Sequence, residues 1–280
     1  MITNVKKQHY VWQHYLKAWS VNNKVWCKRN GVIFNTPTHN IAQERFFYES
    51  IQLNKYEIGF IHDLILKLHP TAHSILSENL DLYILTSEGD DLLRKNGIEK
   101  FHSIFEGRVL KIFNTLRNGD ISILSDDSNK IEFCKFLGRQ YTRTKKIRSS
   151  TVELPKDLPV PDHLVGKCNF QKVFDVFTFL LSESIGNWAY SDGIFNLLET
   201  PENLFLITCD QPINNLDANS NGRSESIKLY YPLSPKKALI ISNDLIEETV
   251  LTSEDVVKLN NHMKRISHEM IFAHIEELLS

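Results

Sequence analysis

The sequence predicts an α+β fold, with a helical central region and small antiparallel sheet elements contributed by both ends of the chain. Through the middle of the chain, apolar residues recur at helical spacing, as they do over 53–68. Near each end, short apolar runs are separated by turn residues, which is the pattern of strands. We therefore expect the two strand-bearing ends to meet in one sheet.

The first elements are predicted to be a short helix and a hairpin. Aromatic and apolar residues over 9–19 fall near helical spacing, which predicts a short helix. The runs 25–27 and 32–34 read as strands on either side of Asn30-Gly31, and Asn-Gly between apolar runs is a strong hairpin signal. A short helix leading into a strand is expected over 41–48.

Helices fill the predicted centre. Pro70 suits the first turn of a helix, Asn118-Gly119 suits a helix end, and Asp126 is an N-cap candidate. A proline-rich joint follows at Pro155, Pro159 and Pro161. The expected helices cover 53–68, 70–85, 89–116, 129–148 and 170–181.

The last part of the chain returns to strands and closes with a helix. Strands are expected at 204–208, 227–231 and 238–242, and Ser253 with Asp255 begins a helix that is predicted to run to 279. The chain 1–280 is read as a single domain or as two coupled lobes. The lobes would be a helical core of about 50–200 and the ends 1–50 and 201–250, closed by the helix 253–279.

Composition excludes several classes of protein. The 280 residues carry a formal net charge of −2, so nucleic-acid binding would need a local basic patch. Four scattered cysteines without a C-x-x-C pair argue against a thiolate zinc site and are typical of a cytoplasmic protein. No stretch approaches the ~20 apolar residues of a membrane span, so no membrane partner is expected. Walker, dinucleotide-binding and G-x-S-x-G motifs are also absent.

Four segments together resemble a family of uncharacterised bacterial proteins, the domain-of-unknown-function family numbered 4238. Residues 9–16, His-Tyr-Val-Trp-Gln-His-Tyr-Leu, resemble its opening H-Y-V-P-Q-x-Y-L, and 140–144 resemble its Q-x-x-R-T. Residues 208–213 resemble its S-D-x-P-V strand end, and 231–235 its P-L-S-P turn. Trp12 replaces the usual Pro and Cys209 the frequent Ser. The resemblance supports the fold and implies no activity.

His9 and Gln13 are the first candidate catalytic residues. They are four residues apart and would share one face of a helix. Because imidazole titrates near neutral pH, this pair could hold and deprotonate a substrate hydroxyl. The alternative is that both residues line a polar patch that docks the N-terminal segment.

Asp210 is a candidate catalytic residue and metal ligand because it ends an apolar strand. The alternative is that it caps the turn before Pro212. Glu49 could join Asp210 and His9 if the ends of the chain meet, and carboxylates with an imidazole would suit Mg or Mn.

Arg139 and Arg143 are the candidate substrate-binding residues. They lie one helical turn apart in the clearest basic run, and arginine forks match phosphate groups. The alternative is a solvated basic helix end.

Two functions follow from these candidates. One is a metal-dependent, nuclease-like effector that acts on nucleic acid in a bacterial defence or toxin setting. The other is a non-catalytic binding module or partner subunit whose motifs serve packing and capping. The test that separates them is whether His9, Gln13, Arg143 and Asp210 surround one cleft or are each satisfied by local backbone.

Overall fold

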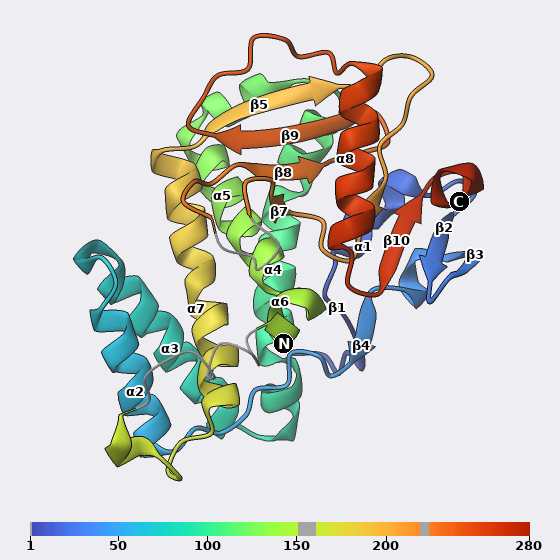
Figure 1. Cartoon of the computed structure of the whole chain (residues 1–280). Helices are drawn as coiled ribbons and strands as arrows, with labels where there is room; N and C mark the ends of the chain where they lie inside the picture. The colour runs from blue at the N-terminus through green and yellow to red at the C-terminus, as the bar shows by residue number, and fades with distance from the viewer. Residues whose placement is uncertain (1, 151–160, 219–223) are drawn as a thin grey trace.

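The computed structural model describes residues 2–150, 161–218 and 224–280. It confirms the α+β fold, with helices in the centre and antiparallel strands from both ends of the chain (Figure 1). Pro155 and Pro159 of the predicted joint lie outside the described residues. The helices are α1 (Gln13–Leu16), α2 (Lys55–Leu66), α3 (His73–Glu88), α4 (Asp91–Arg117), α5 (Asp127–Thr142), α6 (Lys145–Ser150), α7 (Phe170–Ser191) and α8 (Ser253–Ile266).

Helices α4, α5 and α7 stand side by side in the centre of the molecule, and α2 and α3 flank them on one side (Figure 1). The crossing of α5 and α7 is close because both helices carry a glycine there. A Cβ on Gly138 would lie 2.0 Å from the carbonyl oxygen of Ser182, and one on Gly186 would lie 2.9 Å from that of Cys134. Only glycine permits this approach of the two backbones.

Polar side chains fix the starts of most long helices. Asn54 and Glu57 form a capping box at α2, and Thr252 and Asp255 form another at α8. The predicted N-cap Asp126 accepts a hydrogen bond from the backbone N–H of Asn129 at the start of α5.

The first sheet has the strand order β3-β2-β10-β6 and is antiparallel throughout. The predicted hairpin is confirmed, since Asn30 and Gly31 turn between its two strands with φ of 51° and 78°. The C-terminal strand lies beside the N-terminal hairpin, so the two ends of the chain meet as expected. The strands are β2 (Lys24–Arg29), β3 (Val32–Pro37), β6 (Thr208–Cys209) and β10 (Met270–Ala273). A separate pair, β1 (Lys7–His9) and β4 (Gln43–Arg45), joins the first segment to the residues after the hairpin.

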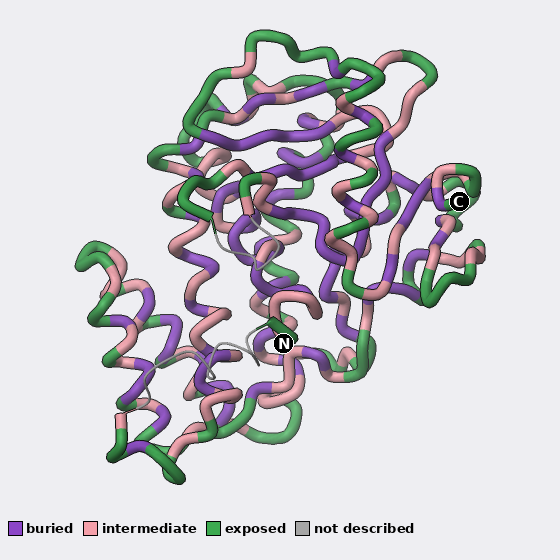
Figure 2. The backbone as a smooth tube through the Cα atoms, viewed as in Figure 1, coloured by how far each residue is buried: buried purple, intermediate pink, exposed green. Residues whose placement is uncertain are grey.

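The second sheet, β5-β9-β8-β7, is buried on both faces, which Figure 2 shows as continuous buried backbone along β8 and β9. Successive residues of a strand point to opposite faces. Accordingly, Leu239 and Ile241 pack with the central helices, whereas Ala238 and Ile240 pack with α8. The strands are β5 (Ile194–Glu199), β7 (Asn214–Asn215), β8 (Leu229–Pro232) and β9 (Lys237–Ser242).

The segment 9–19 departs from the predicted single helix. It enters as β1, bends at 10–11, and continues as α1 and a 3-10 turn, Lys17–Trp19. Residues 10–12 bond to distant backbone and side chains: the N–H of Tyr10 donates to the carbonyl of Ala42 at 3.0 Å. Tertiary partners therefore override the local helical spacing.

The C-terminal end also departs from its predicted form. The helix predicted to run to 279 ends at Ile266 and is followed by β10. Strand pairing with β2 supplies backbone partners that local spacing could not reveal. Similarly, the strand expected at 204–208 is reduced to Thr208–Cys209.

One buried cluster contains residues of the N-terminal segment, the central helices and the second sheet, including Trp19, Phe113 and Tyr231. Whether the chain behaves as one domain or two coupled lobes stays a prediction. Among the described residues, no helix is long and apolar enough to cross a bilayer.

Candidate functional site

The N-terminal motif and the 140–144 motif meet at the buried side chain of Gln140. Its Oε1 accepts from the backbone N–H of Trp12 at 3.2 Å and from Nη2 of Arg143 at 2.5 Å. Its Nε2 donates to the carbonyl of Tyr10 at 3.2 Å. Gln140 therefore fixes the first segment to the end of α5.

The other two motifs join the same core. Thr144 donates its hydroxyl hydrogen to Oε1 of Gln211. The hydroxyls of Tyr15 and Thr208 share a hydrogen bond of 2.6 Å, and the ring of Tyr15 stacks on that of Tyr231 at 5.2 Å. Many of the distinctive side chains of these motifs thus serve packing.

Arg143 lies at the centre of a buried polar cluster on the side of α4. Its Nη2 forms an ion pair with Glu106 at 2.8 Å. Glu99 and Glu106 are seven residues apart and therefore lie on one face of this helix. The pKa of Glu99 is raised to about 7, mainly by burial, with the charge of Arg143 opposing the rise and repulsion from Glu106 adding to it. The sequence reading missed both glutamates, whose only signal was this spacing.

His9 and Gln13 both lie near Thr38, and they do not share a helix face. Nε2 of Gln13 donates to the hydroxyl of Thr38 at 3.4 Å, and the backbone of Thr38 raises the pKa of His9. Burial and then the charge of Arg143 lower the pKa of His9 to about 4, so the ring is neutral at pH 7. Its Nε2 has no hydrogen-bond partner among the described residues.

Asp210 is fully buried and bound by backbone amides. Its carboxylate accepts from the N–H groups of His268 at 2.8 Å, Glu269 at 2.7 Å and Met270 at 3.1 Å. Desolvation raises the pKa of Asp210, and these three hydrogen bonds oppose that rise. The carboxylate thus holds the turn that leads into β10.

Glu49 and Arg139 also have partners of their own. Glu49 forms an ion pair with Arg94. Arg139 pairs with the buried Glu183 of α7, and its guanidinium lies 3.8 Å from the ring centre of Phe105. The described residues contain no group of three histidine, cysteine or acidic side chains placed to hold a metal. Because the carboxylate of Asp210 is held by backbone amides and Glu49 by Arg94, these two residues do not fit a Mg or Mn site.

A basic cavity of about 340 Å³ lies beside Gln13 at the surface. Its cations come from Lys17 and Lys24, and His39 adds an imidazole. No carboxylate is among its lining residues, so an anion would meet no fixed negative charge on its wall. The sequence analysis did not identify Lys17, Lys24 or His39, although two lysines on either side of the turn residues Asn22-Asn23 indicate a local basic surface. The lining residues are Gln13, Lys17, Ser20, Asn22, Asn23, Lys24, Pro37, Thr38 and His39.

Of the six predicted site residues, Gln13 lines the basic cavity, and His9, Arg139, Arg143, Asp210 and Glu49 do not. Thr38 also lines the cavity and accepts from Gln13, and the charge of Arg143 lowers the pKa of His9. Asp210 is held by its own backbone partners.

A family model described as a protein of unknown function (DUF4238) matches residues 7–171 and 190–277. No curated protein and no solved structure matches the chain.

Proposed function

The chain belongs to this family of proteins of unknown function, and from its own residues we propose that it binds nucleic acid at the basic cavity. One observation carries the proposal: Lys17, Lys24 and His39 line a surface cavity that has no carboxylate on its wall. Because each phosphate of a strand is an anion, lysines grouped in this way favour backbone contact. The overall charge of −2 makes such a local patch necessary.

Cleavage of the strand is the second part of the proposal, as a nuclease-like effector in a bacterial defence or toxin setting. Its support is the neutral imidazole of His9, whose buried Nε2 has no hydrogen-bond partner among the described residues. A neutral imidazole is the form that accepts a proton as a general base. We place this activity in the cytoplasm, and the free thiols of the four cysteines support a reducing compartment.

A non-catalytic binding module or partner subunit is the second candidate. The observation that favours it is the use of motif side chains for packing: Gln140 fixes the first segment, and Asp210 holds the turn before β10. In that case, the cavity would hold its ligand without reaction.

Fluorescence anisotropy tests the binding part. Labelled single-stranded RNA, single-stranded DNA and duplex DNA are titrated at several salt concentrations against wild type and a Lys17→Ala/Lys24→Ala double variant. A Lys100→Ala/Lys111→Ala variant of α4, with two exposed lysines outside the cavity, is the matched control. We expect at least a tenfold weaker affinity for the cavity variant only. The slope of log K against log salt should fall by about 0.7 per lost lysine contact on a single strand.

Absence of binding by wild type to all three nucleic acids in 50 mM salt would contradict the proposal, as would equal weakening by the control variant. The same substrates, incubated with Mg or Mn and then with chelator, test cleavage by wild type and His9→Ala. Products from wild type that are lost in a folded His9→Ala variant would support the nuclease. Strand binding by wild type without cleavage products would instead support the non-catalytic binding module.

A further inference from the structure

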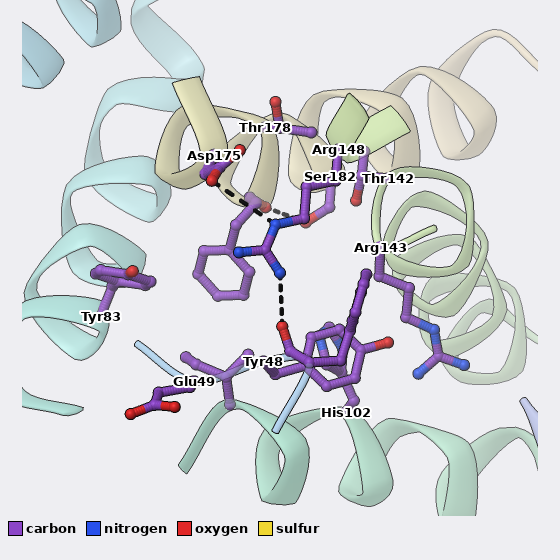
Figure 3. Close-up of a pocket in the computed structure, with 13 residues that line it drawn as sticks. Tyr48, Glu49, Tyr83, His102, Thr142, Arg143, Arg148, Asp175, Thr178 and Ser182 are labelled. Carbon is purple, nitrogen blue, oxygen red and sulfur yellow. Dashed lines mark hydrogen bonds and ion pairs between the residues drawn. The ribbon is translucent and has the colours of Figure 1, made fainter. Parts of the chain in front are cut away.

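A second cavity, of about 90 Å³, lies between α4, α7, the end of α5 with α6, and the segment 47–49 (Figure 3). It is several times the ~10–15 Å³ that one water molecule needs, so it has room for a small molecule. None of its lining residues belongs to the basic cavity. It is therefore a separate site.

Aromatic rings dominate the wall of this second cavity. In Figure 3, Tyr48 lies below the centre and Tyr83 to one side, while Thr178 and Ser182 of α7 lie above. Phe47 and Phe179 complete the aromatic lining. Flat rings gain most from such surroundings because they stack against other rings.

The charged groups at this cavity have partners of opposite charge. Nε of Arg148 lies 3.7 Å from the carboxylate of Asp175, and its Nη1 donates to the carbonyl of Phe47 at 2.8 Å. Glu49 pairs with Arg94, which lies outside the lining. Because positive and negative charges are balanced, the cavity favours an uncharged ligand over an anion.

His102 lines the cavity and has a ring nitrogen without a hydrogen-bond partner among the described residues. Its side chain is 3% exposed and its ring lies 4.6 Å from that of Tyr48. Its Nδ1 is buried and has no partner among the described residues. A buried polar atom without a partner is destabilising, and a bound ligand or water would supply the missing hydrogen bond.

We infer that this cavity binds a flat, uncharged heteroaromatic ring of the nucleobase class, stacked on the aromatic wall and hydrogen-bonded to His102. The hydroxyl of Thr178 offers a further partner for the edge of the ring, and that of Ser182, which donates to the carbonyl of Phe179, offers an acceptor. The choice of a nucleobase rests on the proposed function. The ring comes either from a free base or nucleoside or from a base of the bound strand, since both present the same edge and face.

Isothermal titration calorimetry with adenosine, guanosine, cytidine and uridine tests the inference, and ribose 5-phosphate is the ligand without an aromatic base. Thr178→Leu fills the cavity, and His102→Phe removes Nδ1 while keeping a ring. Thr115→Leu of α4 is the matched control, because Thr115 is also a half-buried helical threonine but lies outside the cavity.

We expect wild type and Thr115→Leu to bind at least one nucleoside equally and to ignore ribose 5-phosphate. Thr178→Leu should bind at least tenfold more weakly, and His102→Phe about fivefold to tenfold more weakly, in line with one lost hydrogen bond. Failure of all four nucleosides to bind wild type would overturn the inference. Unchanged binding by Thr178→Leu, with its fold confirmed by circular dichroism, would overturn it too.

Two further arms separate this inference from the proposed function. The Lys17→Ala/Lys24→Ala variant should keep nucleoside binding while strand binding falls. Loss of binding at the basic cavity is thereby distinguished from loss of binding at the second cavity. Titration of an oligonucleotide in saturating nucleoside distinguishes the source of the ring. Competition indicates a base of the strand and independence indicates a free base or nucleoside, and both support a nucleobase cavity.

Discussion

Gln140 accepts a hydrogen bond from the backbone N–H of Trp12, which lies 128 residues earlier in the chain. The same oxygen binds the guanidinium of Arg143, so one buried amide connects the first segment to the Arg143 cluster. Arg143 also forms the ion pair with Glu106, and its charge lowers the pKa of His9.

Gln140→Leu should destabilise the protein by roughly 2–4 kcal/mol. The substitution keeps the volume but leaves the N–H of Trp12 and part of the Arg143 guanidinium buried without a partner. Urea unfolding followed by circular dichroism measures the change. Gln52→Leu, at an exposed glutamine, should stay within about 0.5 kcal/mol of wild type. A similar loss of stability in both variants would show that the hydrogen bonds of Gln140 do not stabilise the protein.

Gly138→Ala should lower the melting temperature, because the added Cβ would lie 2.0 Å from the backbone oxygen of Ser182. We expect a cost of roughly 2 kcal/mol or more, since α5 and α7 must separate. Gly107→Ala of α4 is the control: nothing lies within 4 Å of its Cβ, so it should gain up to about 1 kcal/mol from helix propensity. Opposite signs of the two shifts in calorimetry are the expected result, and a neutral Gly138→Ala would argue against the close crossing.

Asp210→Asn separates a structural role from a catalytic one. The amide that replaces the carboxylate turns an NH₂ group toward three backbone donors, so we expect a loss of roughly 2–4 kcal/mol. Asp63→Asn, at an exposed aspartate of α2, should be neutral. If Asp210→Asn kept wild-type stability in urea, the carboxylate would not be holding the turn before β10.

Glu99 should make stability fall as pH rises. The pKa of Glu99 is about 7 in the folded protein, against about 4.3 in an unfolded chain. Between these values the unfolded chain binds fewer protons than the folded one, so the free energy of unfolding decreases with pH and levels off above pH 7. The total change is roughly 3–4 kcal/mol.

Glu99→Gln should remove this slope while leaving the fold unchanged. Urea unfolding at pH 5, 6, 7 and 8 measures it, and Glu88→Gln, an exposed glutamate of α3, should keep the wild-type slope. Because His9 has a lowered pKa of about 4, it adds a slope of opposite sign below pH 6.5. The comparison therefore rests on the difference between the two variants, and identical slopes in both would refute the role of Glu99.

The sequence predicted features that depend on neighbouring residues and missed those that depend on distant ones. The hairpin at Asn30-Gly31 and the cap at Asp126 were predicted because turns and caps are built within a few residues. The strand 270–273 was missed because its partner β2 lies at the other end of the chain.

The candidate site shows the same limit. His9 and Gln13 were paired by helical spacing, yet both lie near Thr38, which no local pattern could indicate. Arg143 was identified from its motif, but its partners Glu99 and Glu106 come from another helix. Asp210 was placed correctly at a strand end, and only the fold reveals the three backbone amides around it.

The position of β10 between β2 and β6 sets an order of events during synthesis. The central helices consist of residues that leave the ribosome before the last strand, and their contacts are available early. The hairpin β2–β3 pairs with β10 only after the C-terminal residues are made. Arg29 and Glu269, which meet at this pair of strands, are 240 residues apart. A nascent chain therefore carries one open hairpin edge until the last strand is made.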